Sequence, residues 1–133
     1  MIEKKELGKR LDRLASLYVR RREKRCFTCG KRLAFDKRQA GHYVPRGVLA
    51  VRWHPENIHV QCAHCNVELD GNVKEYAERL DPDIRRVLDY AKERYNIGRA
   101  PAINETEMKI LYNFYLEALK KMKVPTPHEW HKL

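Results

Sequence analysis

Two cysteine pairs constrain the fold of this chain more than any other feature of its sequence. One pair is Cys26 and Cys29, the other is Cys62 and Cys65, and 32 residues lie between them. Each pair can place two thiolates on one ion, and two pairs complete the tetrahedral four-sulfur shell of structural zinc. We therefore expect one zinc ion here rather than disulfides or redox-active thiols. A closed shell has no open position, so this zinc would hold the fold and take no part in chemistry.

Length and composition predict a single folded domain. The chain has 133 residues, of which 43% are hydrophobic and 35% are charged. No apolar run approaches the ~20 residues that cross a bilayer, and the charged first residues do not resemble a secretory signal. We expect a cytoplasmic protein, in the host cytoplasm if a phage encodes it. The predicted parts are a basic N-terminal helix (1–25), a zinc-bound core (26–80), a C-terminal helical arm (81–124) and a loose tail (125–133).

The positive charge is concentrated in the first part of the chain. The net charge is +10, of which residues 1–25 contribute +6 and residues 26–53 contribute +5. This asymmetry indicates a polyanionic partner, with a solvated basic surface as the alternative. Little in the sequence suggests base readout, so we expect recognition of DNA by shape and charge. The residues expected to contact the DNA backbone are Arg20, Arg21, Arg22, Lys24, Arg25, Lys37 and Arg38.

Apolar spacing and turn residues predict a mostly helical α+β fold. Leucines recur at helical intervals near the N-terminus, and Pro82 suits the first turn of a helix. Gly71 breaks the helical pattern, and Asn72 is a candidate N-cap. The predicted helices cover residues 2–25, a segment beginning near 62–65, 73–80, 82–96 and 104–122, and the predicted short strands lie around 39–44 and 57–61.

Several polar residues between and just after the cysteine pairs fit phosphodiester hydrolysis. That reaction needs a base for water, a divalent cation on the phosphate and positive charge around it. His42 is a candidate base, because an unperturbed imidazole titrates near neutral pH. Asn66 and Asp70 lie four residues apart, so both could offer oxygen ligands to a magnesium or manganese ion from one helical face. Arg46, beside Gly47, is a candidate phosphate clamp.

These residues resemble a known family of nucleases. A histidine after a strand, a central asparagine and a polar residue behind a cysteine pair form the HNH pattern, which reads here His42, Asn57 and Asn66. An asparagine in the third place is similar to phage endonuclease VII. A closer resemblance, over about residues 26–76, is to the phage NinG (Rap) recombination proteins. It is carried by Ala40-Gly41-His42-Tyr43, Asn57-Ile58-His59, Gln61-Cys62, Cys65-Asn66 and Gly71-Asn72.

The resemblance implies a fold, an activity and a substrate. The fold is a ββα-metal core (HNH, or His-Me finger) held by zinc and flanked by helices. The activity is a structure-specific endonuclease that uses a divalent metal on Holliday junctions and D-loops. Many HNH enzymes carry an acidic or histidine metal ligand directly before the base, where this chain has Gly41. We name His59 and Asp70 as candidate replacements, and we expect Asn57 to brace the loop that carries His42.

We therefore predict a metal-dependent DNA endonuclease for branched DNA. Two alternatives stay open: a non-catalytic zinc-ribbon module that binds DNA or protein, and an HNH nickase that works with a phage packaging terminase. Paired cuts on a four-way junction favour a homodimer, because a two-fold assembly matches the symmetry of the substrate. The candidate interface is an apolar surface on the last helix, which the chain's own helices 2–25 and 82–96 could instead cover. Its residues are Leu111, Tyr112, Phe114, Tyr115, Leu116 and Leu119.

Overall fold

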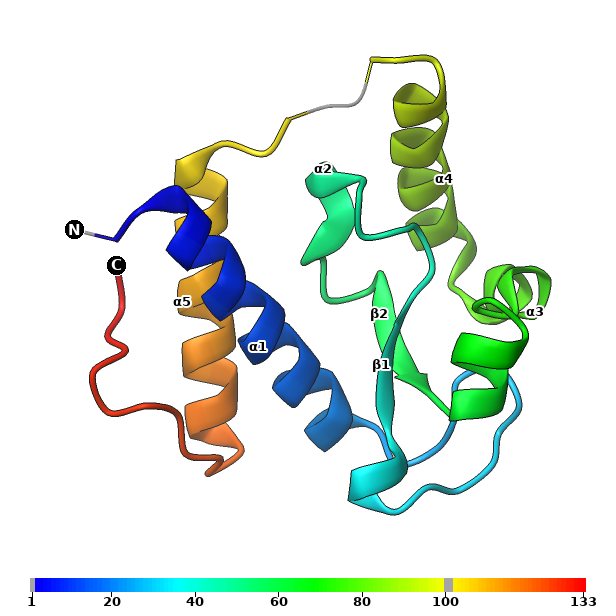
Figure 1. Ribbon diagram of the computed structural model, residues 1–133, viewed down its shortest axis with the longest axis horizontal. Coiled ribbons are helices and arrows are strands. Elements are labelled where there is room, and N and C mark those ends of the chain that lie inside the picture. Colours follow the sequence, from blue (N-terminus) through cyan, green and yellow to red (C-terminus); the bar gives the residue numbers. More distant parts are fainter. Residues whose placement is uncertain (1, 100–101) are drawn as a thin grey trace.

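The computed structural model describes residues 2–99 and 102–133 (Figure 1). Helices dominate these residues and surround a small sheet of two antiparallel strands, which confirms a mostly helical α+β fold. Within the described ranges, no helix is both long enough and apolar enough to span a bilayer. In chain order the elements are α1 (Lys4–Arg22), η1 (Phe35–Lys37), β1 (Gln39–His42), α2 (Leu49–Arg52), β2 (Ile58–Gln61), η2 (His64–Glu68), α3 (Val73–Arg79), α4 (Pro82–Asn96) and α5 (Glu105–Lys121).

The helix boundaries follow local chemistry. The Asp81 side chain accepts hydrogen bonds from two backbone amides at the start of α4, and Pro82 occupies its first turn as predicted. Asn104 caps α5 in the same way through Glu107 N–H. Asn72 also precedes a helix, but its side chain does not cap α3. Its amide donates to the Cys65 sulfur at 3.7 Å instead.

The two long helices α1 and α5 pack side by side and form most of the larger core (Figure 1). Most leucines of the predicted face of α1 are buried, with Leu7 and Leu11 fully inaccessible and Leu17 only partly buried. They meet Tyr112, Tyr115 and Leu119 of α5, which are also fully buried. This packing places α1 beside the sheet as well, because α1 contacts both strands.

The expected dimer surface on α5 is therefore largely internal. α1 covers Tyr112, Tyr115 and Leu119, and Leu116 is only 9% exposed, whereas Phe114 remains exposed. The alternative, burial by the chain's own helices, holds in part. Figure 1 shows that α1 is the covering helix, while α4 lies on the far side of the sheet.

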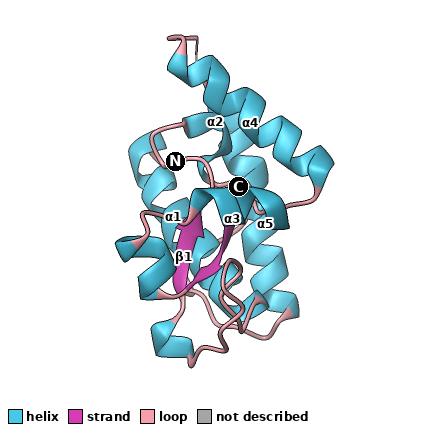
Figure 2. Cartoon of the chain, turned by 90° about the vertical axis from the view of Figure 1, so that its right-hand side faces the viewer, coloured by secondary structure: helices cyan, strands magenta, loops and turns pink. Residues whose placement is uncertain are grey.

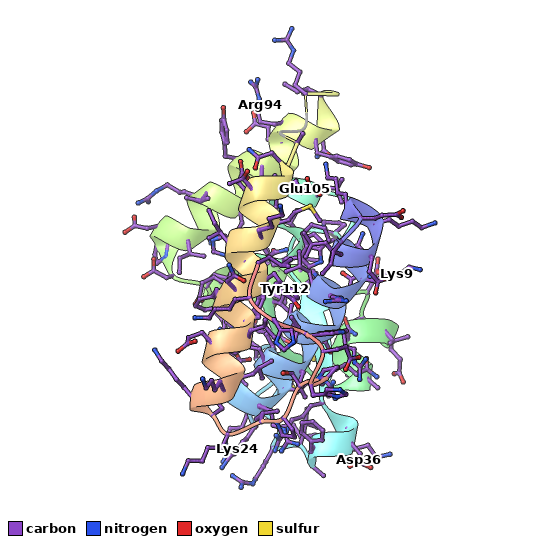
Figure 3. All side chains as sticks on the ribbon, turned by 90° about the vertical axis from the view of Figure 1, so that its left-hand side faces the viewer. Lys9, Lys24, Asp36, Arg94, Glu105 and Tyr112 are labelled. Carbon is purple, nitrogen blue, oxygen red and sulfur yellow. The ribbon has the colours of Figure 1, made fainter. Side chains whose placement is uncertain are left out.

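The C-terminal tail is not loose, contrary to our prediction. Residues 125–133 cross the face formed by α1 and α5 (Figure 3). The ring of Trp130 lies 4.8 Å from the Arg10 guanidinium and 5.3 Å from that of Arg13, and it packs on the larger core. Lys132 also pairs with Glu117 at 2.9 Å. Cation–π contacts and a partly buried ring attach to α1 and α5 a segment whose proline content suggested mobility.

The two-stranded sheet separates two hydrophobic clusters. β1 and β2 lie within the two predicted strand segments and pair antiparallel, with His42 opposite Ile58. Because side chains alternate along a strand, Ile58 and Val60 face α1 and the larger cluster, and their neighbours face the other way. On that second side, α3 lies in front of the strands (Figure 2). The smaller cluster packs there and comprises Tyr43, Val44, Val48, Val51, Tyr76, Leu80, Leu88 and Ala91.

A close contact between the strands requires glycine at position 41. A Cβ atom on Gly41 would lie 1.9 Å from Oε1 and 2.9 Å from Cγ of Gln61. Gln61 is fully buried, and its amide donates to the Thr28 hydroxyl and to the Gly71 carbonyl, so it cannot move aside without losing both bonds. The glycine is therefore a packing requirement of the sheet.

We predict opposite effects for two glycine-to-alanine substitutions. Gly41→Ala should lower the free energy of unfolding by about 1–3 kcal/mol, the usual cost of overpacking. Gly8→Ala, the matched control, adds a Cβ in ordinary contact 3.5 Å from Trp53 within α1, so it should raise stability by about 0.5–1 kcal/mol. Urea denaturation measures both. A neutral Gly41→Ala variant would contradict the packing argument.

Candidate active site and metal cluster

The four cysteines come together as the sequence predicts. Their sulfur atoms all lie within 4.8 Å of one another, and the sulfurs of Cys29 and Cys62 are 3.8 Å apart. Zinc–sulfur bonds of about 2.3 Å in a tetrahedron place sulfurs about 3.8 Å apart, so the cluster has the size of a zinc site. All four are free of disulfides. These residues can hold one zinc ion in a closed shell.

Local backbone structure presents the sulfurs. In the first pair, Cys26 N–H donates to the Lys31 carbonyl at 2.8 Å, and Gly30 adopts a positive φ of 78° that closes the turn. The second pair opens the helical turn η2. Burial and neighbouring thiols raise the pKa of Cys29 to about 12, since the cluster cannot carry four negative charges without a cation. Bound zinc would supply that charge.

His42 ends β1 with its tautomer fixed by the backbone. Its Nε2 lies 3.0 Å from the Arg52 carbonyl oxygen, which can only accept a hydrogen bond. Nε2 therefore carries the proton, and Nδ1 carries the free lone pair of a neutral imidazole. Burial lowers the pKa of His42 to about 4, so the ring is neutral at pH 7. The side chain is thus prepared to accept a proton at Nδ1.

Asn57 braces the loop that follows His42. It is fully buried, and its Oδ1 accepts from Val44 N–H at 2.8 Å. Its Nδ2 donates to the carbonyls of Val44 and Val51, both at 3.1 Å. These three bonds satisfy most of the amide inside the protein. They fix the two ends of the loop, so the role of Asn57 is to position the backbone around His42.

A surface pocket beside His42 collects most of the predicted site residues. This cavity, here called the His42 pocket, has a volume of about 560 Å³ and is lined by Arg46, Asn66 and Asp70. The Asn66 amide donates to the Gln39 side chain at 2.8 Å, which leaves its carbonyl oxygen as a possible ligand. Asp70 lies in the turn after η2 with a positive φ of 49°, so it does not share a helical face with Asn66 as we predicted. One amide oxygen and one carboxylate fit a magnesium-like ion that keeps most of its waters.

The structure adds Lys92 to the His42 pocket, a residue that no motif indicated. Lys92 belongs to α4, outside the segment between the cysteine pairs. The sequence contains one weak indication that Lys92 lies near the protein interior. Lys92 follows the buried Ala91 and lies one turn after the buried Leu88, so it flanks the inward stripe of its helix.

Arg46 reaches the pocket from a salt bridge with α1. Its guanidinium lies 3.1 Å from the Asp12 carboxylate, and its side chain is 58% exposed. Asp12 also accepts two bonds from Arg52 and one from Trp53 Nε1. Despite partial burial, these donors lower the pKa of Asp12. Because Asp12 keeps these partners if Arg46 leaves, the exposed guanidinium can turn toward an anion at little cost.

His59 does not join the pocket. It is 7% exposed, its ring stacks on Phe27 with centroids 3.9 Å apart, and its Nδ1 lies 2.7 Å from the Glu23 carboxylate. The physical reason is the strand register. His42 pairs with Ile58, so the next residue of β2 points to the opposite face of the sheet. His59 is thus not placed to replace the missing ligand.

The environment of Gly41 explains why an acidic residue is missing before His42. Gln61 fills the space that a side chain at position 41 would need, and its own Oε1 is buried without a hydrogen-bond partner. The same side chain links the cluster to the pocket, because it bonds Thr28, which contacts the Cys26 sulfur, and Gly71, which follows Asp70. Of our two candidate replacements, only Asp70 lies in the His42 pocket.

The predicted DNA-contacting residues divide into two groups. Arg20, Arg22 and Arg38 are partly buried and bond the protein itself; Arg22, for example, donates to the carbonyls of Pro55 and Ile58. The members with exposed side chains are Arg21, Lys24, Arg25 and Lys37. Lys24 extends from the end of the molecule at which η1 also lies (Figure 3).

Comparison with known proteins identifies one family. Residues 2–123 match the family model described as Bacteriophage Lambda NinG protein. Comparison with the curated proteins and with the solved structures finds no significant match. The matched range contains the cysteine cluster and the His42 pocket, and it extends over the flanking helices α1, α4 and α5.

We predict that zinc is required for the folded state. Purified protein should contain about one zinc per chain, and removing it should abolish the helical circular dichroism signal until zinc is restored. Cys65→Ser should lose the metal. His64→Ala is the matched control, because His64 lies between two cysteines but is 61% exposed and pairs with Glu68. A metal-free protein with unchanged stability would contradict this prediction.

Proposed function

This chain belongs to the NinG family, and we propose that it is a metal-dependent endonuclease of the HNH type that cuts branched DNA during phage recombination. One observation carries the proposal. A neutral histidine with a free Nδ1 shares a pocket with an amide oxygen, a carboxylate and two cations. A zinc module that only binds DNA or protein has no need of this arrangement.

His42 would act as the general base. Its Nδ1 would remove a proton from a water molecule while the water oxygen attacks phosphorus. The bond from phosphorus to the leaving oxygen then breaks, and that oxygen takes a proton from solvent. The Nε2–H bond to the Arg52 carbonyl holds the ring during proton transfer and favours the imidazolium that forms. Asn57 keeps the supporting loop in place.

The residues for a catalytic ion would be Asn66 and Asp70. Magnesium or manganese bound there would polarise the phosphate and stabilise charge on the leaving oxygen. The two side chains project from η2 and the turn that follows it, which begins at the second cysteine pair. The chain itself supplies the remaining positive charge through Arg46, which can exchange its exposed salt bridge with Asp12 for a phosphate.

DNA would be held mainly through its backbone. The net charge of +10, concentrated before residue 54, supports contacts with phosphates. A four-way junction needs two cuts, and each chain offers one His42 pocket, so we propose that two chains act together. The interface is not the buried face of α5, because α1 already covers it.

We predict that His42→Ala abolishes cleavage and preserves DNA binding. Loss of a general base costs about 10²–10⁴ in rate, whereas affinity depends on backbone cations. Four-way, forked and linear DNA of matched sequence should be tested with and without magnesium or manganese. His128→Ala is the control, since His128 is fully exposed in the tail.

Two outcomes would count against the proposal. Cleavage by His42→Ala at the parent rate would remove the histidine from the mechanism. Tight DNA binding with no cleavage of any substrate by the parent protein would favour the zinc-ribbon binding module.

We predict that Arg21 contributes to DNA binding and that its neighbour Arg22 contributes to stability. Arg21→Gln should reduce the slope of log affinity against log salt by about 0.9 and leave the melting temperature unchanged, because Arg21 is exposed. Arg22→Gln should instead lower the free energy of unfolding by about 1.5–3 kcal/mol, because Arg22 donates to the backbone carbonyls of Pro55 and Ile58 and to the Glu23 carboxylate. Fluorescence anisotropy and urea denaturation measure the two effects. An unchanged slope for Arg21→Gln would place DNA elsewhere.

A further inference from the structure

We infer that Lys92 of α4 is the side chain that neutralises the phosphate held beside His42. The inference rests on the nuclease function proposed for the same pocket. It assigns a role in the site to the C-terminal helical arm, which contains no residue of the HNH pattern. Three observations support it: the contacts that position α4, the place of Lys92 in the pocket and the lack, among the described residues, of a salt bridge to Lys92.

α4 is anchored directly to the residue that follows His42. The Tyr43 hydroxyl donates to the Asp89 carboxylate at 2.6 Å; burial, with this contact as the next cause, raises the pKa of Tyr43 to about 12. Leu88 and Ala91 are buried in the same cluster as Tyr43. The anchor therefore sets both the rotation and the register of α4 against the end of β1. Lys92, three residues after Asp89, is carried by the same face to the pocket.

α4 also overlies the loop that carries Arg46. The Tyr95 hydroxyl lies 3.6 Å from the position that a Cβ atom would take on Gly47. Lys92 and Arg46 thus line the His42 pocket together with His42, Asn66 and Asp70. A phosphate in this pocket would have a cation on the α4 side and a second on the loop side.

Arg46 and Lys92 differ in whether they already form a salt bridge. Arg46 is paired with Asp12. Lys92 is partly buried, and within residues 2–99 and 102–133 it forms no salt bridge with an acidic side chain. An ammonium that is not already held in a salt bridge can pair with an arriving phosphate without first breaking another ion pair. A lysine on a flexible stem presents three donors, which suits a phosphate whose charge shifts between oxygens during cleavage.

The test compares Lys92→Gln with Arg86→Gln, an exposed cation on the same helix that pairs with Asp83. Single-turnover cleavage of four-way junction DNA should slow roughly 10²-fold in Lys92→Gln, the cost of removing one donor to the transition state. Arg86→Gln should match the parent, and Lys92→Arg should recover most of the rate. Tyr43→Phe should also slow cleavage, but it should add little to Lys92→Gln, because both act through the position of one ammonium.

A second measurement does not depend on activity. Without added magnesium or manganese, Lys92→Gln should reduce the salt dependence of junction binding by about 0.9 in slope, and Arg86→Gln should not. A parent protein that cleaves nothing would refute the nuclease function, while this slope would still decide the phosphate contact. Lys92→Gln with the parent slope overturns our inference, as does a cleavage rate equal to that of Arg86→Gln.

Discussion

Convergence of the four cysteines is the constraint on which the site depends. It joins two segments separated by 32 residues, the end of the α1 region and the turn after β2. The second cysteine pair fixes the start of η2. Asn66 lies in η2, and Asp70 lies in the turn that follows it. The side chain of Gln61 also links the cysteine cluster to the His42 pocket. Its amide NH₂ donates to Thr28 beside the cluster and to the Gly71 carbonyl beside the pocket. Bound metal would add a cross-link between these segments to the stability that the two hydrophobic clusters provide.

The same packing limits what the pocket can contain. Gln61 occupies the space beside Gly41, so the position before His42 cannot carry an acidic ligand. The His42 pocket therefore has one carboxylate, Asp70, together with Arg46 and Lys92. In the nuclease that we propose, a site with few anionic side chains and two cations would suit a hydrated ion bound chiefly through the phosphate of the DNA. Burial keeps His42 neutral, which is the state that a base needs before it accepts a proton.

Much of the fold could be predicted because its signals are local. The helix over 82–96 follows from Pro82 and a regular apolar stripe, and the strands follow from short segments bounded by turn residues. The cluster of four cysteines follows from their spacing alone. Asn57 was expected to brace the loop after His42, and its three buried hydrogen bonds do so. In each case the residue type and its neighbours along the chain carry the information.

The sequence by itself determined the cysteine cluster and the order of helices and strands, and it named His42, Asn66 and Asp70 as site candidates. The tertiary structure decided which side chains meet from distant elements. Because of the strand register, His59 points to the opposite face of the sheet from His42. The Tyr43–Asp89 contact positions α4 so that Lys92 lies beside His42. Packing of α1 on α5 buried most of the expected dimer surface, and inward hydrogen bonds occupy Arg22, one of the residues predicted to contact DNA. Spacing along a chain specifies local faces, but pairing between distant faces depends on how the whole core packs.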